Sequence, residues 1–80
     1  GMSNYVEIFD NIIFVLSQFA ETDKALNIEE VELKLGVSKR TAQRLCKSLS
    51  ESGWLYFKRV GHDKLYFASE KTKRLFGDKP

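Results

Sequence analysis

The segment from residue 35 to 45 constrains the fold most, because its glycine and serine are spaced like the end of one helix and the start of the next. Gly36 supplies the positive φ that ends a helix abruptly. Ser38, two residues later, is a good N-cap. Val37 between them is the apolar residue that holds two helices at a steep angle. The segment therefore predicts two helices joined by a tight turn, a helix-turn-helix.

The second of these helices has one apolar side and one basic side. Its apolar residues recur at i, i+3, i+4 and i+7, a single helical stripe formed by Ala42, Leu45, Cys46 and Leu49. The rest of its surface carries basic and amide side chains, namely Lys39, Arg40, Gln43, Arg44 and Lys47. Arginine hydrogen-bonds guanine bidentately, and glutamine does the same to adenine, so this surface suits the major groove of DNA.

Charge is divided unevenly along the chain, although the formal net charge is only +2. Residues 1–35 carry seven acidic side chains against two lysines, a balance of −5. Residues 36–80 carry eleven basic side chains against four acidic ones, a balance of +7. A domain polarised in this way presents its positive half to a polyanion. Because the basic half coincides with the predicted helix-turn-helix, a nucleic acid is favoured over an ordinary solvated surface.

Length and composition indicate one small domain over residues 1–80. Gly1 before Met2 is typical of a residue left by cleavage of an expression tag, and it is set aside. A single cysteine allows no intramolecular disulfide, which fits the cytoplasm, and no apolar run reaches membrane-spanning length. Cys46 is expected to be a buried small hydrophobe.

The chain contains no pattern typical of an enzyme or of a metal site. One cysteine and one histidine cannot build a zinc site within one chain. There is no plausible nucleophile with its base and no glycine-rich phosphate loop. We therefore expect no catalytic activity, no metal, no cofactor and no small-molecule ligand.

Local signals give the bounds of the two helices of the helix-turn-helix and predict four further elements: a helix before them, and two strands and a short helix after them. Asn-x-x-Glu capping boxes at Asn4 and Asn27 open helices over about 4–20 and 28–35. The basic helix runs over 39–52 and stops at Gly53. Residues 54–60 and 65–68 predict two strands of a hairpin whose turn is 61–64, followed by a short helix over 70–76. The helix-turn-helix thus spans 28–52, and the hairpin spans 54–68.

Aromatic residues of the hairpin are divided between its two faces by the period-2 alternation of a strand. Leu55 and Phe57 are expected to face the core, whereas Trp54, Tyr56 and Tyr66 stay unassigned.

This order of elements resembles that of winged helix-turn-helix domains over nearly the whole chain. The run Leu35-Gly36-Val37-Ser38-Lys39-Arg40-Thr41-Ala42-Gln43-Arg44, followed by Leu49 and Gly53-Trp54-Leu55, is similar to DeoR-type and related bacterial regulators. Ala42 replaces a larger aliphatic residue of that family, and Leu45-Cys46 replaces an acidic-leucine pair. The effector-sensing domain of that family is absent from these 80 residues.

The resemblance implies a mainly α fold with a β-hairpin (α+β): a three-helix core, a two-stranded wing and a short C-terminal helix. The function that it implies is sequence-specific binding of double-stranded DNA by a small cytoplasmic bacterial or phage transcriptional regulator. A winged helix used only for protein–protein interaction is the main alternative, since one scaffold hosts both uses. The cations in register on the basic helix favour DNA, and nothing specific argues for RNA.

The expected DNA contacts come from the basic helix and the wing. They are Ser38, Lys39, Arg40, Thr41, Gln43, Arg44, Lys47, Arg59, His62 and Lys64. Arg40, Gln43 and Arg44 are assigned to base edges, while Lys39 and Lys47 are assigned to phosphates. Within the wing, Arg59 and Lys64 are the preferred pair for the DNA backbone.

The first helix is apolar over about half of its circumference, more than a one-sided stripe requires. Its second stripe is formed by Tyr5, Ile8, Ile12, Val15 and Phe19. This stripe is either the interface of a homodimer, which would place two basic helices on successive half-sites, or is covered by the hairpin or the last helix within one monomer. The sequence leaves both alternatives open.

Overall fold

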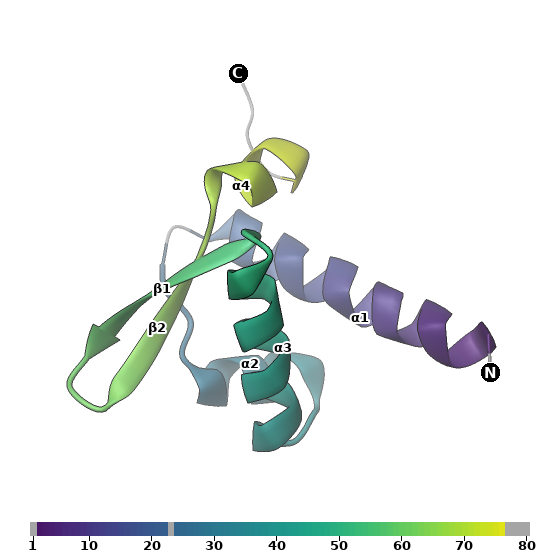
Figure 1. Ribbon diagram of the computed structural model, residues 1–80, viewed down its shortest axis with the longest axis horizontal. Helices are drawn as coiled ribbons and strands as arrows, with labels where there is room; N and C mark the ends of the chain where they lie inside the picture. Colours follow the sequence, from purple (N-terminus) through teal and green to yellow (C-terminus); the bar gives the residue numbers. More distant parts are fainter. Residues whose placement is uncertain (1, 23, 77–80) are drawn as a thin grey trace.

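The computed structural model describes residues 2–22 and 24–76. Its elements, in chain order, are α1 (Met2–Glu21), α2 (Ile28–Leu35), α3 (Lys39–Glu51), β1 (Leu55–Val60), β2 (Asp63–Ala68) and α4 (Glu70–Phe76). Figure 1 shows the antiparallel hairpin β1–β2 extending to one side of the helices, while the N-terminal end of α1 extends to the other. The architecture is a winged helix-turn-helix, mainly α with a β-hairpin, as the sequence predicts.

The turn between α2 and α3 has the geometry expected from its sequence. Gly36 adopts a left-handed conformation (φ 67°, ψ 37°), and its N–H donates to the carbonyl of Glu32 over 2.7 Å. Ser38 caps α3, because its Oγ accepts a hydrogen bond from the N–H of Thr41 over 3.2 Å. Gly36 thus ends α2, and Ser38 starts α3 three residues after the last residue of α2.

The predicted capping box of α2 is also present. The N–H of Glu30 donates to Asn27 Oδ1, and the N–H of Asn27 donates to Glu30 Oε1, both over 2.9 Å. These bonds satisfy backbone groups that a helix N-terminus leaves unpaired.

Every long element contributes to one hydrophobic core, in which α3 packs on α2 and β1, and α1 packs on α2, β2 and α4. The buried residues are Val15, Leu16, Phe19, Leu26, Val31, Ala42, Cys46, Leu49, Leu55, Tyr66 and Ala68. Cys46 is fully buried, and burial raises the pKa of its thiol to about 11. The thiol therefore stays protonated at neutral pH and packs as a small hydrophobe, as predicted.

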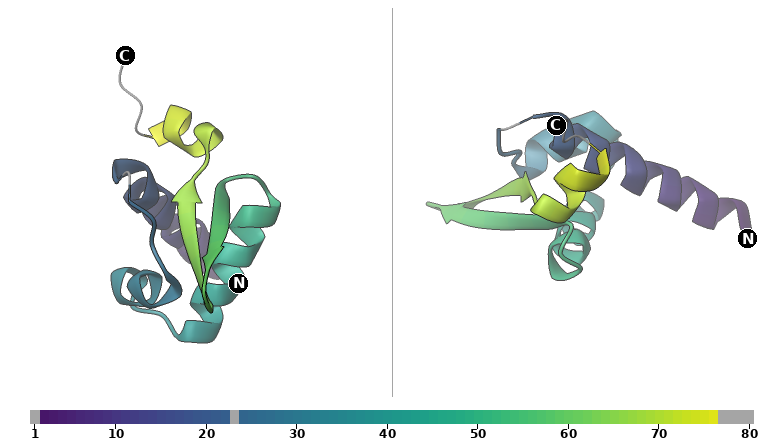
Figure 2. Two further views of the ribbon diagram at one scale, coloured as in Figure 1. Left: turned by 90° about the vertical axis from the view of Figure 1, so that its left-hand side faces the viewer. Right: turned by 90° about the horizontal axis from the view of Figure 1, so that it is seen from above.

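Helix α1 departs from its predicted form in two ways. It begins at Met2, so the capping box expected at Asn4 is wrong. Its apolar surface is divided along its length rather than between two faces: Val15 and Phe19 are buried in the monomer, whereas Tyr5 is 73% exposed. The division arises because α1 is longer than the body against which it packs (Figure 2). Val15 and Phe19 are therefore unavailable to a second copy of the chain.

No helix within residues 2–22 and 24–76 is long and apolar enough to cross a membrane, α1 included.

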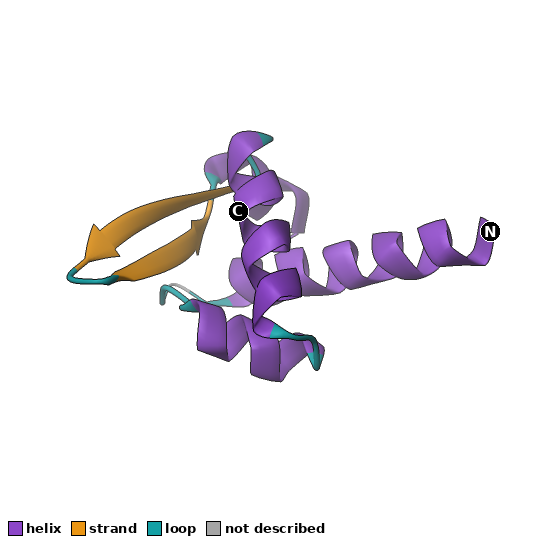
Figure 3. Ribbon diagram, turned by 60° about the horizontal axis from the view of Figure 1, so that its bottom comes forward, coloured by secondary structure: helices purple, strands orange, loops and turns teal. Residues whose placement is uncertain are grey.

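The hairpin has a tighter turn than predicted, because β2 begins at Asp63 rather than at residue 65, while β1 begins one residue later than predicted, at Leu55. Only Gly61 and His62 separate the strands, with Gly61 at φ 62°, the conformation that glycine favours at the first position of a type II′ turn (Figure 3). Leu55 is buried, but Phe57 is 41% exposed, so its expected place in the core is wrong. Phe57 lies on the inward face opposite Tyr66, which is buried, but the β1 side of this face is exposed beyond Leu55.

Two connections that the sequence did not reveal hold the hairpin to the helices. Leu26 forms an isolated β-bridge with Tyr66, through two backbone hydrogen bonds of 2.9 Å, and both side chains are buried. At the other end, Ser69 Oγ donates to the carbonyl of Gly53 over 2.7 Å, and the buried Thr72 donates to the carbonyl of Trp54. These bonds fix the root of the wing relative to the end of α3.

We expect the two phenylalanines of α1 to differ sharply in their contribution to stability. Phe19 is fully buried, so Phe19→Ala should lower the free energy of unfolding by about 3–5 kcal/mol. Phe14 lies on the exposed side of the same helix, and Phe14→Ala should cost about 1 kcal/mol or less. Urea unfolding followed by circular dichroism measures both values. Equal losses would contradict the placement of the core along the C-terminal half of α1.

Candidate nucleic-acid interface

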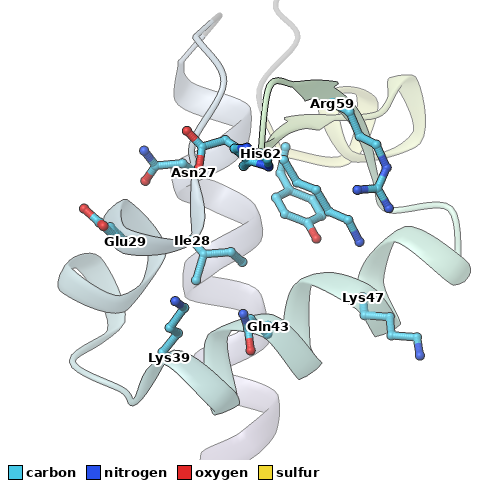
Figure 4. A pocket seen from close by; sticks show the side chains of 11 residues that line it. Asn27, Ile28, Glu29, Lys39, Gln43, Lys47, Arg59 and His62 are labelled. Atoms are coloured by element: carbon cyan, nitrogen blue, oxygen red, sulfur yellow. The ribbon is translucent and has the colours of Figure 1, made fainter.

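Helix α3 exposes two neighbouring rows of side chains opposite its buried stripe. Lys39, Gln43 and Lys47 follow one another at intervals of four residues and lie on the side of α3 that faces the wing (Figure 4). Arg40 and Arg44 form a second row, one residue further round the helix, and both are exposed. The apolar stripe of Ala42, Cys46 and Leu49 fixes this orientation, because its burial leaves only the opposite side in solvent.

A cleft of about 490 Å³ separates the wing-side row of α3 from the hairpin. It is lined by Asn27, Ile28, Glu29, Lys39, Gln43, Lys47, Arg59, His62, Asp63, Lys64 and Tyr66 (Figure 4). Lysines from α3 thus lie across the cleft from a lysine and an arginine of the wing. Two successive elements, α3 and the hairpin, therefore bring four cations to one concave surface, which Glu29 and Asp63 also line.

The two wing cations share one aromatic support. Arg59 and Lys64 are directly opposite each other in the hairpin register, so their side chains lie on the same face. The Arg59 guanidinium lies 5.9 Å from the centre of the Phe57 ring, and Lys64 Nζ lies 4.7 Å from it. Like charges directly across a hairpin destabilise it, and the exposed ring relieves this through cation–π contact. An anion bound between the cations would relieve the repulsion further.

The floor of the cleft is uncharged. Tyr66 is buried there, tilted against Phe57 with ring centres 5.7 Å apart. Burial raises the pKa of Tyr66, Cys46 raises it further, and Arg59 lowers it. The phenol therefore stays neutral at physiological pH, and the positive charge of the cleft comes from its rim.

The predicted DNA-binding residues fall into three places. Ser38 and Thr41 lie at the start of α3, where their side-chain oxygens are 3.1 Å apart and serve the cap. Arg40 and Arg44 lie on the outer row, away from the cleft. The remaining six line the cleft and are Lys39, Gln43, Lys47, Arg59, His62 and Lys64. All ten are exposed, except for Lys64, which is half-buried.

The cleft also includes residues that the sequence did not assign to DNA binding, chiefly Asn27 and Glu29 at the start of α2 and Tyr66 in β2. Their place depends on how α2 packs beside α3 and on the bridge to Leu26, and no local pattern reports either. In the part of the chain that the structure describes, no three His, Cys, Asp or Glu side chains gather as a metal site would require.

Comparison with solved structures supports the fold. Reduced HlyU from Vibrio cholerae superposes with a TM-score of 0.70 at 17% sequence identity, over 81% of this chain and 67% of that one. Human N-acetylserotonin methyltransferase, in complex with SAM, superposes with a TM-score of 0.62 at 16% identity, over 86% of this chain. The match spans only 22% of the methyltransferase chain. At these identities the likeness concerns the fold alone.

Comparison with protein families gives a specific assignment. No curated protein shows significant sequence similarity to the chain. The IclR helix-turn-helix domain matches residues 10–59, a segment that contains α2, α3 and most of α1 and β1. The family match and the structural match together confirm the expected winged helix-turn-helix regulator, whereas membership of the DeoR-type family is not shown. The chain belongs to the IclR helix-turn-helix domain family of DNA-binding transcriptional regulators.

Proposed function

We propose that this domain binds double-stranded DNA. The outer row of α3 enters the major groove, and the phosphate backbone of one DNA strand lies against the cleft. Two rows of exposed side chains on α3 carry the proposal. The arginine row is the outer row, formed by Arg40 and Arg44, and the lysine row is the wing-side row, formed by Lys39, Gln43 and Lys47. The lysine row continues across the cleft onto the wing, whereas the arginine row does not. Each row therefore meets a different part of the duplex.

The arginine row is assigned to base edges. Arg40 and Arg44 are exposed, one turn apart, and outside the cleft. A helix inserted in the major groove presents such side chains to successive base pairs, and arginine pairs bidentately with guanine. Gln43 lies in the wing-side row between the two lysines, so we assign it to a base edge beside the DNA strand that the cleft holds.

The cleft is assigned to phosphates. Lys39 and Lys47 on α3 and Arg59 and Lys64 on the wing surround it from two sides. Contacts of this kind position a protein on DNA without specifying sequence, and they depend strongly on salt because bound counterions are released. His62, at the tip of the wing, is assigned to the same strand.

We also propose that two copies of the chain act as a homodimer in the bacterial cytoplasm. One domain with a single α3 covers one half-site, and a two-fold pair covers two half-sites about one helical turn apart. The cytoplasm holds the DNA of a bacterial cell, and a free thiol at Cys46 suits its reducing conditions.

The arginine row should determine sequence preference. A DNA site is first selected from random duplexes, and affinity is then measured by fluorescence anisotropy. Arg40→Ala and Arg44→Ala should each weaken binding to the selected site by about 1–3 kcal/mol and relax the preference at one base pair. The charge-matched control is the double variant Lys24→Ala, Arg74→Ala, which removes two exposed cations outside the proposed interface. Unchanged affinity and preference in a folded Arg40→Ala, Arg44→Ala variant would refute the assignment.

The wing should contribute affinity that is independent of sequence. In the double variant Arg59→Ala, Lys64→Ala, affinity for selected and random duplexes should fall by similar factors. The slope of log affinity against log salt should become shallower by about 0.9 for each lost phosphate contact. Titrations at several salt concentrations measure both quantities. A loss confined to the selected site, or an unchanged slope, would show that the wing does not bind the backbone.

A further inference from the structure

The hairpin has a second face, turned away from the cleft, that carries aromatic and basic side chains. Tyr56 is directly opposite Phe67 in the register, and both lie on the face that Arg59 and Lys64 do not occupy. The two rings are stacked, with centres 5.0 Å apart and an angle of 11° between their planes. Neither ring lines the cleft beside α3. We call this side of the hairpin the outer face.

A small pocket of about 160 Å³ lies at the root of the outer face, where the hairpin meets α4 and the connection after α1. It is lined by Thr22, Lys24, Tyr56, Phe67, Ala68 and Lys73. None of these described residues is acidic, and Asp63, the one carboxylate of the hairpin, lies beside the turn at the opposite end. The pocket shares no lining residue with the cleft. In Figure 1, α4 lies above the root of the hairpin and α3 lies below it.

The ring pair offers a surface on which a further flat ring can stack. Tyr56 is 45% exposed although Phe67 covers one side of its ring, so much of the rest of that ring is open to solvent. A cavity of roughly 150 Å³ accommodates one benzene molecule, so the pocket has room for one six-membered ring beside Tyr56. A pyrimidine base has this size and shape.

Lysines lie on both sides of the ring pair along the direction of β1. Lys24 and Lys73 line the pocket at the root. Lys58 lies two residues, roughly 6.6 Å, nearer the tip than Tyr56, and its Nζ is 5.5 Å from the centre of the Phe67 ring. A single small anion would be held by cations that converge on one point. Cations on both sides of a stacking ring suit a chain that carries a phosphate on each side of a base.

We propose that the outer face binds single-stranded DNA, with one pyrimidine base stacked on Tyr56 in the pocket. The neighbouring phosphates are held by Lys24, Lys58 and Lys73. Basic surfaces with aromatic rings on which bases stack are a general device for binding single strands. A duplex does not suit this face, because its bases are stacked on one another and present only their edges in the grooves.

The choice of DNA rather than RNA rests on the proposed function. The inner face of the same hairpin is assigned to the backbone of duplex DNA, so an unpaired strand beside that duplex lies within reach of the outer face. The two faces then hold two forms of the same nucleic acid. No local sequence motif marks the outer site, because its parts come from the connection after α1, from the hairpin and from α4.

Fluorescence anisotropy with a labelled oligothymidylate of about ten nucleotides tests the site, since one small domain covers a length of that order. Tyr56→Leu should weaken binding about fivefold or more, because the stacked base loses its ring partner. Tyr56→Phe should bind like the wild type, because the ring remains. Phe14→Leu is the matched control: Phe14 is 47% exposed on α1, outside both proposed surfaces, and its replacement should change nothing. Circular dichroism confirms that each variant is folded.

Salt dependence and base preference test the lysines and the pocket. In the double variant Lys24→Ala, Lys73→Ala, the slope of log affinity against log salt should become shallower by about 0.7 for each lost phosphate contact. Oligothymidylate should bind more tightly than oligoadenylate of the same length, because a purine is larger than the pocket. An unchanged slope, or equal binding of the two oligonucleotides, contradicts the placement of the base and its phosphates.

A wild type that binds no oligothymidylate overturns the proposal, and so do equal affinities for Tyr56→Leu and the wild type. Thymidine monophosphate that competes as well as oligothymidylate also overturns it, because the pocket then holds a small anion only. Tighter binding of oligouridylate than of oligothymidylate overturns the choice of DNA.

Duplex binding by the same variants separates this inference from the proposed function. Arg59→Ala, Lys64→Ala should lose affinity for duplexes and keep it for oligothymidylate, whereas Tyr56→Leu should do the reverse. Oligothymidylate binding that is lost in Arg59→Ala, Lys64→Ala and kept in Tyr56→Leu takes place in the cleft, which contradicts the inference and leaves the proposed function standing. A chain that binds oligothymidylate through Tyr56 and binds no duplex contradicts the proposed function and leaves the outer site standing.

Discussion

Burial of one stripe of α3 is the constraint on which the rest of the structure depends. Ala42, Cys46 and Leu49 pack into the core, and their spacing on the helix fixes which residues remain in solvent. The arginine and lysine rows are therefore consequences of core packing as much as of composition. Gly36 and Ser38 set where α3 starts, so the same turn that ends α2 also determines the orientation of the proposed DNA-binding surface.

The wing suits the role proposed for it because it is held at its root and exposed at its tip. Hydrogen bonds from Ser69 and the bridge between Leu26 and Tyr66 fix it beside α3. Its inward face carries Tyr66, which is buried, and the exposed Phe57 with two cations. Four cations line the cleft against two carboxylates, Glu29 and Asp63, and this excess of positive charge favours an anionic ligand such as the backbone of DNA.

Features set by a few neighbouring residues were mostly predictable from the sequence, apart from the cap at Asn4 and the length of the hairpin turn, whereas features that depend on tertiary distance were not. The caps at Asn27 and Ser38, the turn at Gly36 and the basic side of α3 follow from local chemistry. The exposure of Phe57 and the division of α1 depend on where the body of the domain ends, which periodicity does not report. The candidate site follows the same rule, because α3 residues could be named from their helical spacing, whereas the grouping of Gln43 with the wing required the fold.

Backbone amide NMR of the chain during titration with a short selected DNA duplex tests the central claim most directly. If α3 and the inner face of the wing form one DNA-binding surface, shift changes should concentrate in residues 38–47 and 59–64. The amides of α4, residues 70–76, should change little. Changes centred on α4 or on the N-terminal half of α1, with α3 and the wing unaffected, would contradict the account.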